Sequence, residues 1–286
     1  MTERLPAGTE DPDLVPRPLV GLTIRGTPTA EGLLHRHDKA ELLYVISGVI
    51  TVQAATGIWT VPPRCAFWLP KGVEHMADAS GHFEAGALYV VADLAERMPG
   101  ACCIVFVQPL LRELILRFIR SPQLYPEGDS REARLAAVLL DELQAAPVEP
   151  LHLPFPADRR LRRLTEAVRE QPSLRLSLEE WGSRVGASSR TLSRLFRSET
   201  GMSFVRWRQQ LHIGLTLQHL AMGRSVATIA HDLGYESVSA FIAMFRRLLG
   251  TTPARYFSEA MGAKPDQASE GVVLRMTPDG ITPADA

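Results

Sequence analysis

The sequence has little cysteine and no long apolar segment. Only three of its 286 residues are cysteines, Cys65, Cys102 and Cys103, and their spacing matches neither a metal motif nor a disulfide framework. The longest apolar run, residues 101–107, is far too short to cross a bilayer, and the amino end has no signal-like apolar core. These absences argue against a disulfide-stabilised secreted scaffold and predict a cytoplasmic protein with no membrane partner.

The carboxyl-terminal part lacks lysine altogether. Residues 157–257 contain 16 arginines, no lysine and 8 acidic residues, a net charge of +8, although the whole chain has a net charge of −1. Residues 1–156 contain 13 basic and 19 acidic residues, a net charge of −6. A basic segment attached to an acidic one is typical of a phosphate-binding module joined to another domain, and the length suits two domains.

A first pair of short helices is expected within the basic segment. Ser177, followed three residues later by Glu180, forms a capping-box pattern that starts a helix over residues 178–185. Gly186 begins a turn, and a second helix follows over residues 189–197. Two short helices joined by a glycine-containing turn suit the DNA major groove. The candidate DNA-binding residues on the second helix are Ser189, Arg190, Ser193, Arg194 and Arg197.

A second pair repeats this plan about fifty residues later. A helix over residues 226–233 is followed by Gly234, where a sharp turn needs a left-handed residue, and Ser237 is an N-cap. The next helix carries an apolar stripe of Phe241, Phe245 and Leu248. Its opposite face is less polar than that of the first pair, so we expect looser base reading. The candidate DNA-binding residues here are Ser237, Ser239, Ile242 and Arg246.

Several residues of the basic segment resemble one known family. They are Arg190-Thr-Leu-Ser-Arg-Leu-Phe196, Thr200-Gly201, Gly234-Tyr-Glu-Ser237, Ala240-Phe241, Phe245-Arg246, Gly250 and Thr252-Pro253 with Tyr256. Residues 157–257 resemble the AraC/XylS family of bacterial transcription regulators. The resemblance implies sequence-specific binding of double-stranded DNA, with Arg190 and Arg194 near base edges, and RNA polymerase as a further partner.

Residues 19–92 predict a domain built from short strands. Runs rich in β-branched and aromatic residues alternate with turn pairs such as Ser47-Gly48, Lys71-Gly72 and Ser80-Gly81, which is typical of a small barrel or sandwich. Residues 109–146 switch to helical periodicity, with one stripe of Leu111, Leu114, Ile115 and Phe118 and another of Leu135, Val138, Leu139 and Leu143. The resemblance implies dimerisation through such helices, so we expect a homodimer.

Three histidines and a carboxylate stand out in the strand-rich part. His35 and His37 are two residues apart and share one face of an extended segment, Glu41 follows, and His75 closes the pattern Pro70-x-Gly72-x-x-His75. Such a set suits one divalent transition metal, namely Ni, Zn, Fe or Mn. Alternatively, these histidines only line a pocket for an organic effector. The pattern resembles the two cupin motifs, with Arg64 in place of a usual glycine and Ala79 in place of a usual asparagine.

The expected fold class is therefore α+β, with a cupin-like β-barrel and flanking helices followed by an all-α domain of two helix-turn-helix motifs. We expect a disordered tail over residues 1–18, an effector-binding and dimerisation domain over 19–150, a DNA-binding domain over 157–260, and a disordered tail over 262–286. The predicted function is a transcription regulator, not an enzyme, controlled by a small molecule or a metal ion. The alternatives are a cupin metalloenzyme fused to a DNA-binding domain, and a constitutive DNA-binding protein.

Overall fold

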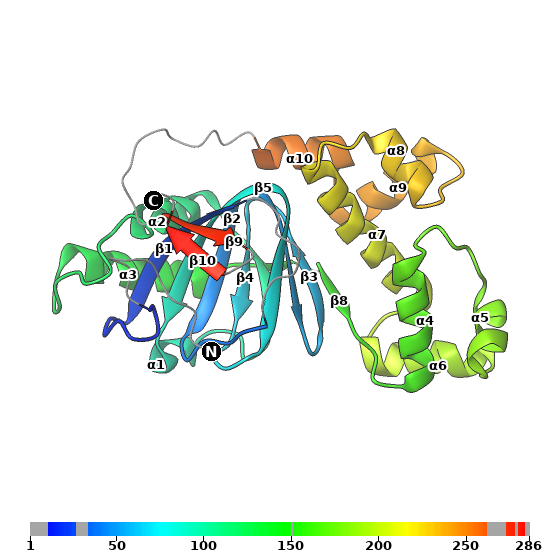
Figure 1. The fold of residues 1–286 in the computed structure, drawn as a ribbon, viewed down its shortest axis with the longest axis horizontal. Coiled ribbons are helices and arrows are strands. Elements are labelled where there is room, and N and C mark those ends of the chain that lie inside the picture. Colours follow the sequence, from blue (N-terminus) through cyan, green and yellow to red (C-terminus); the bar gives the residue numbers. More distant parts are fainter. Residues whose placement is uncertain (1–10, 27–33, 150, 262–272, 278–279, 284–286) are drawn as a thin grey trace. The chain divides into compact units, whose positions relative to one another are not determined.

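The computed structural model describes residues 11–26, 34–149, 151–261, 273–277 and 280–283, and the chain divides into two compact units (Figure 1). The first unit comprises residues 1–54, 59–150 and 260–286, and the second comprises residues 55–58 and 151–259. Among the described residues, no helix is long and apolar enough to cross a membrane.

The first unit is built on a largely antiparallel sheet. Its strands are β1 (Leu19–Gly26), β2 (Ala40–Ala54), β3 (Gly57–Val61), β4 (Cys65–Leu69), β5 (His75–Val90), β6 (Cys103–Phe106), β7 (Val148–Glu149), β9 (Val273–Thr277) and β10 (Gly280–Pro283). Their order is β10-β9-β1-β5-β2-β4-β6-β7, and β3 pairs with β2. The long strands β2 and β5 pair along most of their length and form the centre of the sheet.

The sequence predicted a turn at Ser47-Gly48, but the structure has none there. β2 runs through this pair, and the pairing with β5 shifts register between Val45 and Val49. Gly48 has φ of 78°, and a Cβ at this position would lie 2.7 Å from the carbonyl oxygen of His82. A left-handed glycine lets a bulge bend the strand while the ladder continues on both sides. β5 likewise continues through Ser80-Gly81.

Two amphipathic helices pack on the sheet and close its main apolar core. They are α2 (Pro109–Phe118) and α3 (Arg131–Gln144), and a short helix α1 (Ala92–Ala95) precedes them. Leu111, Ile115 and Phe118 of α2 are buried, as their stripe predicted. The stripe predicted on α3 is partly wrong, because Val138 is 47% exposed. The buried residues of α3 are Ala136, Leu139, Leu140 and Leu143.

The expectation of a disordered tail over residues 1–18 is wrong for residues 11–18, while residues 1–10 lie outside the described part. Lys39 holds this segment against the sheet: its ammonium is buried and donates to the carbonyl oxygens of Pro12 at 2.6 Å and Val15 at 2.7 Å. The Asp13 carboxylate accepts from the backbone N–H of Lys39 at 2.9 Å. A buried ammonium needs acceptors, and these residues provide them.

The expected carboxyl-terminal tail also contains structure. β9 pairs in parallel with β1, and β10 pairs antiparallel with β9, whereas residues 262–272, 278–279 and 284–286 lie outside the described residues. The physical reason is that β1 would otherwise expose an unpaired edge beyond β5.

The second unit is helical. Its helices are α4 (Arg159–Glu170), α5 (Leu178–Val185), α6 (Ser189–Thr200), α7 (Phe204–Ala221), α8 (Val226–Asp232), α9 (Val238–Leu249) and α10 (Pro253–Met261), preceded by the short strand β8 (His152–Pro154). The predicted capping box at Ser177 and Glu180 is confirmed. Serine side chains also cap α6, α7, α8 and α9, and glycines in left-handed conformation end α5, α6 and α9.

Each helix-turn-helix motif has its own apolar interior. Around α5 and α6, a core cluster joins α4 to the first half of α7 and includes Leu164, Trp181, Phe196 and Trp207. Around α8 and α9, the buried residues are Ile229, Leu233, Phe241, Met244 and Phe245. Met244 takes the interior place that the sequence assigned to Leu248, which is only partly buried. The long helix α7 runs from one motif to the other.

Candidate ligand pocket and DNA-reading helices

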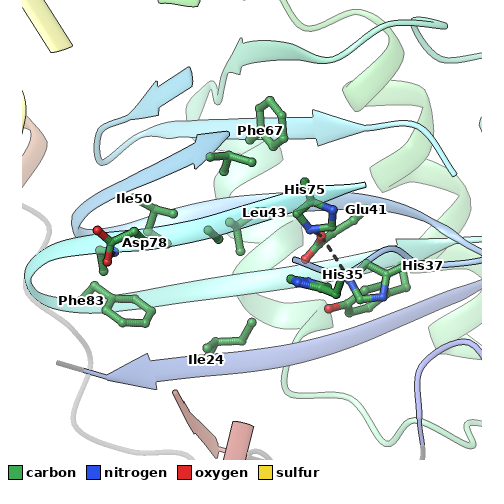
Figure 2. A pocket seen from close by; sticks show the side chains of 14 residues that line it. Ile24, His35, His37, Glu41, Leu43, Ile50, Phe67, His75, Asp78 and Phe83 are labelled. Carbon is green, nitrogen blue, oxygen red and sulfur yellow. Dashed lines mark hydrogen bonds and ion pairs between the residues drawn. The ribbon is translucent and has the colours of Figure 1, made fainter. Parts of the chain in front are cut away.

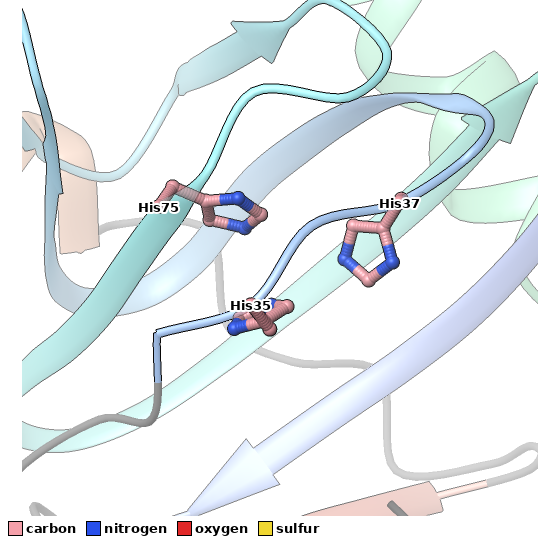
Figure 3. Close-up of side chains that lie close together, drawn as sticks. All are labelled: His35, His37 and His75. Atoms are coloured by element: carbon pink, nitrogen blue, oxygen red, sulfur yellow. The ribbon is translucent and has the colours of Figure 1, made fainter. Parts of the chain in front are cut away.

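The backbone brings His35 and His75 together. The two residues form an isolated antiparallel bridge, in which each backbone N–H donates to the carbonyl oxygen of the other at 2.9 Å. His37 follows two residues later and reaches the same space, as its spacing predicted (Figure 3). The ring centroids of His35 and His75 lie 4.2 Å apart, and those of His35 and His37 lie 5.0 Å apart.

One ligand nitrogen from each of the three histidines lies within 4.8 Å of the others. Glu41 joins two of them: its Oε2 is 3.6 Å from Nε2 of His37 and 3.5 Å from Nε2 of His75. The structure therefore brings together all four predicted ligand residues, with the carboxylate beside His37 and His75. Figure 2 shows this cluster at one end of a pocket.

The charges of the cluster are coupled. Burial by itself would raise the pKa of Glu41, but the hydrogen bond from His75 and the three nearby histidines lower it to about 2. Burial works against protonation of His75, yet its hydrogen bond and charge interaction with Glu41 raise the pKa of this imidazole. Burial, followed by the nearby Glu41, raises the pKa of Tyr89 well above its ordinary value. Glu41 is therefore a carboxylate, and Tyr89 is a neutral phenol.

The donor set fits a transition metal. Nδ1 of His75 lies 3.1 Å from the carbonyl oxygen of Val73, which can only accept, so Nδ1 carries a proton. Nε2 faces Glu41, and once it gives up the proton that it donates to this carboxylate it presents a lone pair to the cluster, the tautomer that metal-binding histidines use. Oδ2 of Asp13 lies 3.8 Å from Nδ1 of His37. Three imidazoles and a carboxylate are ligands for Ni, Zn, Fe or Mn.

Beyond the cluster, the pocket is mostly apolar. Its empty space amounts to about 660 Å³, a volume that includes open solvent. Apart from Asp78, the polar side chains that line it lie at the histidine end (Figure 2). The apolar lining residues are Ile24, Leu43, Ile50, Val52, Phe67, Ala77, Ala79 and Phe83. Such a pocket can bury an apolar body and can bond a polar group at one end.

The first candidate recognition helix is α6. All five residues predicted to contact DNA are exposed, namely Ser189, Arg190, Ser193, Arg194 and Arg197. Leu192 and Phe196 are fully buried on the opposite side of the helix. Ser188, which the sequence assigned to the turn, is the N-cap and accepts from the backbone N–H of Thr191.

The second candidate recognition helix, α9, is less polar on its outer face. Ser237, Ser239 and Arg246 are exposed and Ile242 is partly buried. Ser237 is the N-cap, and its hydroxyl accepts from the backbone N–H of Ala240 at 3.1 Å. Val238 is 38% exposed, so an apolar side chain accompanies Ile242 on this face.

Sequence reasoning missed three residues near these sites. Tyr89 lies against His37, with ring centroids 5.0 Å apart, but it stands fourteen residues after His75 without a motif. Asp13 lies in a segment that looks unstructured. His212 is buried within α7 and bonds to Tyr235. The one available signal for His212 was a histidine in an otherwise apolar stretch of the helix, which more often marks a satisfied core residue.

A helical unit with two capped helix-turn-helix motifs, joined to a sheet domain with a pocket, defines a DNA-binding regulator with a ligand-binding domain. Two family models match the chain, and their ranges overlap over residues 181–198. Residues 181–259 match a helix-turn-helix domain, and residues 32–198 match the AraC-like ligand binding domain. The chain belongs to the AraC family of transcription regulators, as the resemblance predicted, and its sheet domain is the ligand-binding part.

Individual relatives support the same assignment. The HTH-type transcriptional regulator NimR of Escherichia coli (strain K12) is 36% identical over 269 residues, which cover 94% of this chain and 98% of the relative. The HTH-type transcriptional regulator RipA of Corynebacterium glutamicum is 33% identical over 79% of this chain and 64% of its own length. Among solved structures, ToxT from Vibrio cholerae with a bound unsaturated fatty acid has 12% identity and a TM-score of 0.36, covering 87% of this chain and 97% of that one.

Proposed function

We propose that this regulator holds one divalent transition metal at His35, His37 and His75, with Glu41 as a further ligand or close partner. The observation that carries the proposal is the convergence of one nitrogen from each histidine to within 4.8 Å. A bound metal would supply a positive Lewis-acid centre at the polar end of the pocket. Its identity would be Ni, Zn, Fe or Mn, ions for which imidazole and carboxylate are suitable ligands.

Metal analysis of the full chain tests this proposal. We expect about one equivalent of metal per chain after purification or after incubation with Ni, Zn, Mn or Fe(II). A metal that binds the folded state alone raises its stability by about 2.7 kcal/mol at a hundredfold excess over Kd. His75→Ala should abolish the shift of the thermal melt. His82→Ala serves as the control, because His82 is not among the clustered nitrogens. A melt that no metal moves would contradict the proposal.

We further infer that the effector is a small apolar molecule with one polar group at the histidine end. The support is the lining of the pocket away from the histidines, which offers apolar side chains such as Ile50, Phe67 and Phe83, with Asp78 as its one polar residue. A sugar would bury many hydroxyl groups against these walls without partners, and each unpaired hydroxyl costs about 1–3 kcal/mol.

Simple probes distinguish these ligand classes. Butyrate, hexanoate and octanoate carry one polar group and increasingly long apolar bodies. Their affinity should rise about fourfold per added methylene, because burying one is worth about 0.8 kcal/mol. L-Arabinose and L-rhamnose should leave the melt unchanged. Ala77→Phe, which fills the wall of the pocket, should weaken the longest probe most. A response to either sugar, or no dependence on chain length, would contradict the assignment.

The remaining expectations concern partners and assembly. We propose a regulator that acts through DNA affinity and RNA polymerase and does not turn over its ligand. If the sheet domain were instead a metalloenzyme, the protein would form product from the bound molecule; a regulator would form none. We also propose a homodimer through α2 and α3, supported by the exposed apolar side chains of Leu110 and Val138. Light scattering should give a dimer mass that Val138→Glu lowers. Leu124→Glu, an equally exposed position outside both helices, should leave that mass unchanged.

A further inference from the structure

The turn between α8 and α9 is seated on the loop between α4 and α5. Gly234, in this turn, has φ of 76°, and a Cβ at its position would lie 2.7 Å from the carbonyl oxygen of Ser173. Gly250 ends α9 with the same φ of 76°, but nothing lies within 4 Å of its Cβ position. Gly234 is therefore constrained twice, by its conformation and by close contact with the loop that precedes the first motif.

His212 of α7 joins the same turn to the same loop. Its Nε2 lies 3.1 Å from the carbonyl oxygen of Pro172, and its Nδ1 lies 3.0 Å from the hydroxyl oxygen of Tyr235. A carbonyl oxygen can only accept, so Nε2–H donates to Pro172 and the Tyr235 hydroxyl donates to Nδ1. His212 is only 5% exposed. A neutral imidazole thus completes a hydrogen-bonded link from the loop before the first motif to the turn of the second motif.

The link continues to the second recognition helix. The Tyr235 ring packs edge-on against Phe241 of α9, with centroids 5.2 Å apart. The Arg175 guanidinium lies 5.7 Å from the same Tyr235 centroid and also pairs with Glu236 at 3.0 Å. A continuous set of contacts therefore runs from the α4–α5 loop, through His212 and Tyr235, to Phe241 at the core of α9.

We propose that His212 and Tyr235 are positioning residues that hold the two helix-turn-helix motifs in one fixed relative orientation. Helix α7 has 18 residues and spans about 27 Å, which sets the distance between the motifs. One connecting helix leaves the second motif free to rotate around its end. The contacts of Gly234, His212 and Tyr235 with the α4–α5 loop, here called the junction, are a second point of attachment. They remove this freedom, so α6 and α9 meet DNA at one separation and one relative angle.

The consequence is a strict spacing between the two half-sites of the operator. One inserted base pair moves the second half-site by about 3.4 Å along the DNA axis. It also rotates that half-site by about 34°, since B-DNA makes a turn in about 10.5 base pairs. Two motifs held in a fixed orientation cannot adjust to this displacement, whereas motifs that move relative to each other can adjust to part of it.

The experiment uses the full chain and a duplex selected from random DNA by the wild-type protein. The Kd is measured for this duplex and for versions with one or two base pairs inserted between the half-sites. We expect insertion to weaken wild-type binding at least about tenfold, the cost of losing specific base contacts. The variants are His212→Ala, Tyr235→Phe and Gly234→Ala. They should bind the native spacing more weakly, and insertion should cost each of them less than it costs the wild type.

Two matched controls separate positioning from a general loss of stability. Gly250→Ala introduces the same backbone strain in the same motif without touching the α4–α5 loop. Thr165→Val removes a buried hydroxyl that donates to Arg162 within α4. For both variants, the ratio of the Kd for the inserted duplex to the Kd for the native duplex should equal the wild-type ratio. The proposal is overturned if the junction variants also keep that ratio, if wild-type binding tolerates insertion, or if selection returns a single half-site.

Discussion

The guanidinium of Arg64 lies 5.4 Å from the centroid of the Phe106 ring, while its own backbone is left-handed with φ of 68°. Arg64 is the one residue other than glycine with positive φ among those the structure describes. The resemblance to the second cupin motif predicts glycine at this position. A favourable side-chain contact thus coexists with an unfavourable backbone conformation, and the two contributions can be measured separately.

Arg64→Gly should relieve the strain of the left-handed backbone at this position, and Arg64→Ala should not. A non-glycine residue in this conformation costs about 1–2 kcal/mol, while an exposed cation–π contact contributes about 0.5–1 kcal/mol. Both variants lose the contact with Phe106, so the glycine variant should exceed the alanine variant in unfolding free energy by at least about 1 kcal/mol. Urea unfolding of the two proteins measures this difference. Equal stabilities would mean that the surrounding structure absorbs the strain.

The buried His212 predicts a pH-dependent stability of the DNA-binding unit. Burial first, and then the facing charges of Arg208 and Arg175, lower its pKa to about 4, despite the raising effect of its bond to Pro172. The unfolded chain therefore binds a proton near pH 6.5 that the folded chain binds only near pH 4. Stability is full above pH 6.5 and falls as the pH drops towards 4, by about 2 kcal/mol at pH 5.

Unfolding of wild type and His212→Gln at pH 7 and pH 5 measures this contribution. The wild type should lose about 2 kcal/mol more than the variant over this interval. His231→Gln is the control, because the His231 side chain is 91% exposed. The same pH response in wild type and His212→Gln would show that His212 is not the titrating group.

Arg194 should read bases rather than phosphates. Its side chain is exposed on α6, and arginine can pair with both guanine O6 and N7, at about 1–3 kcal/mol of discrimination per contact. Arg194→Ala should therefore relax specificity at one or two base pairs of the operator, measured as Kd for each single-base change. A loss equal on every sequence, with a salt slope lower by about one, would identify a phosphate contact instead.

The second half-site should be read mainly through thymine methyl groups. Val238 and Ile242 lie on the outer part of α9, and neither side chain can distinguish hydrogen-bond donors from acceptors. Replacing thymine by deoxyuridine in this half-site should weaken binding by up to about fourfold per lost methyl contact. The same replacement in the half-site read by α6 should have little effect. Strict guanine or cytosine requirements in both half-sites would contradict this prediction.

The helical half of the protein was largely predictable from sequence because its signals are local. Ser177 with Glu180, and the glycines at 186 and 250, mark helix ends within three or four residues of the groups that they bond. The clustering of His35, His37, Glu41 and His75 followed from alternation along extended chain together with motif spacing. The junction at His212 could not be predicted in this way, because its partners Pro172 and Tyr235 are distant in sequence.

The errors in the sheet domain have related causes. Ser47-Gly48 carries the same residues as a hairpin turn, and only the long partner strand β5 makes it a bulge. At the carboxyl end, Pro278-Asp279-Gly280 is a turn sequence between two short apolar stretches and was the available signal for β9 and β10. Their pairing with β1, about 250 residues earlier, depends on an unpaired edge that no local pattern reveals.

The hydrogen bonds of the Lys39 ammonium limit how many amino-terminal residues can be removed from this protein. An isolated sheet domain cut at residue 19 would start neatly at its first strand, yet it would lose the carbonyl oxygens of Pro12 and Val15. The buried ammonium would then be left without these carbonyl acceptors, and leaving a buried donor unsatisfied costs about 1–3 kcal/mol, or more when the group is charged. A sheet domain that folds autonomously must therefore retain the proline-rich segment from Asp11 onward, although its composition suggests a dispensable leader.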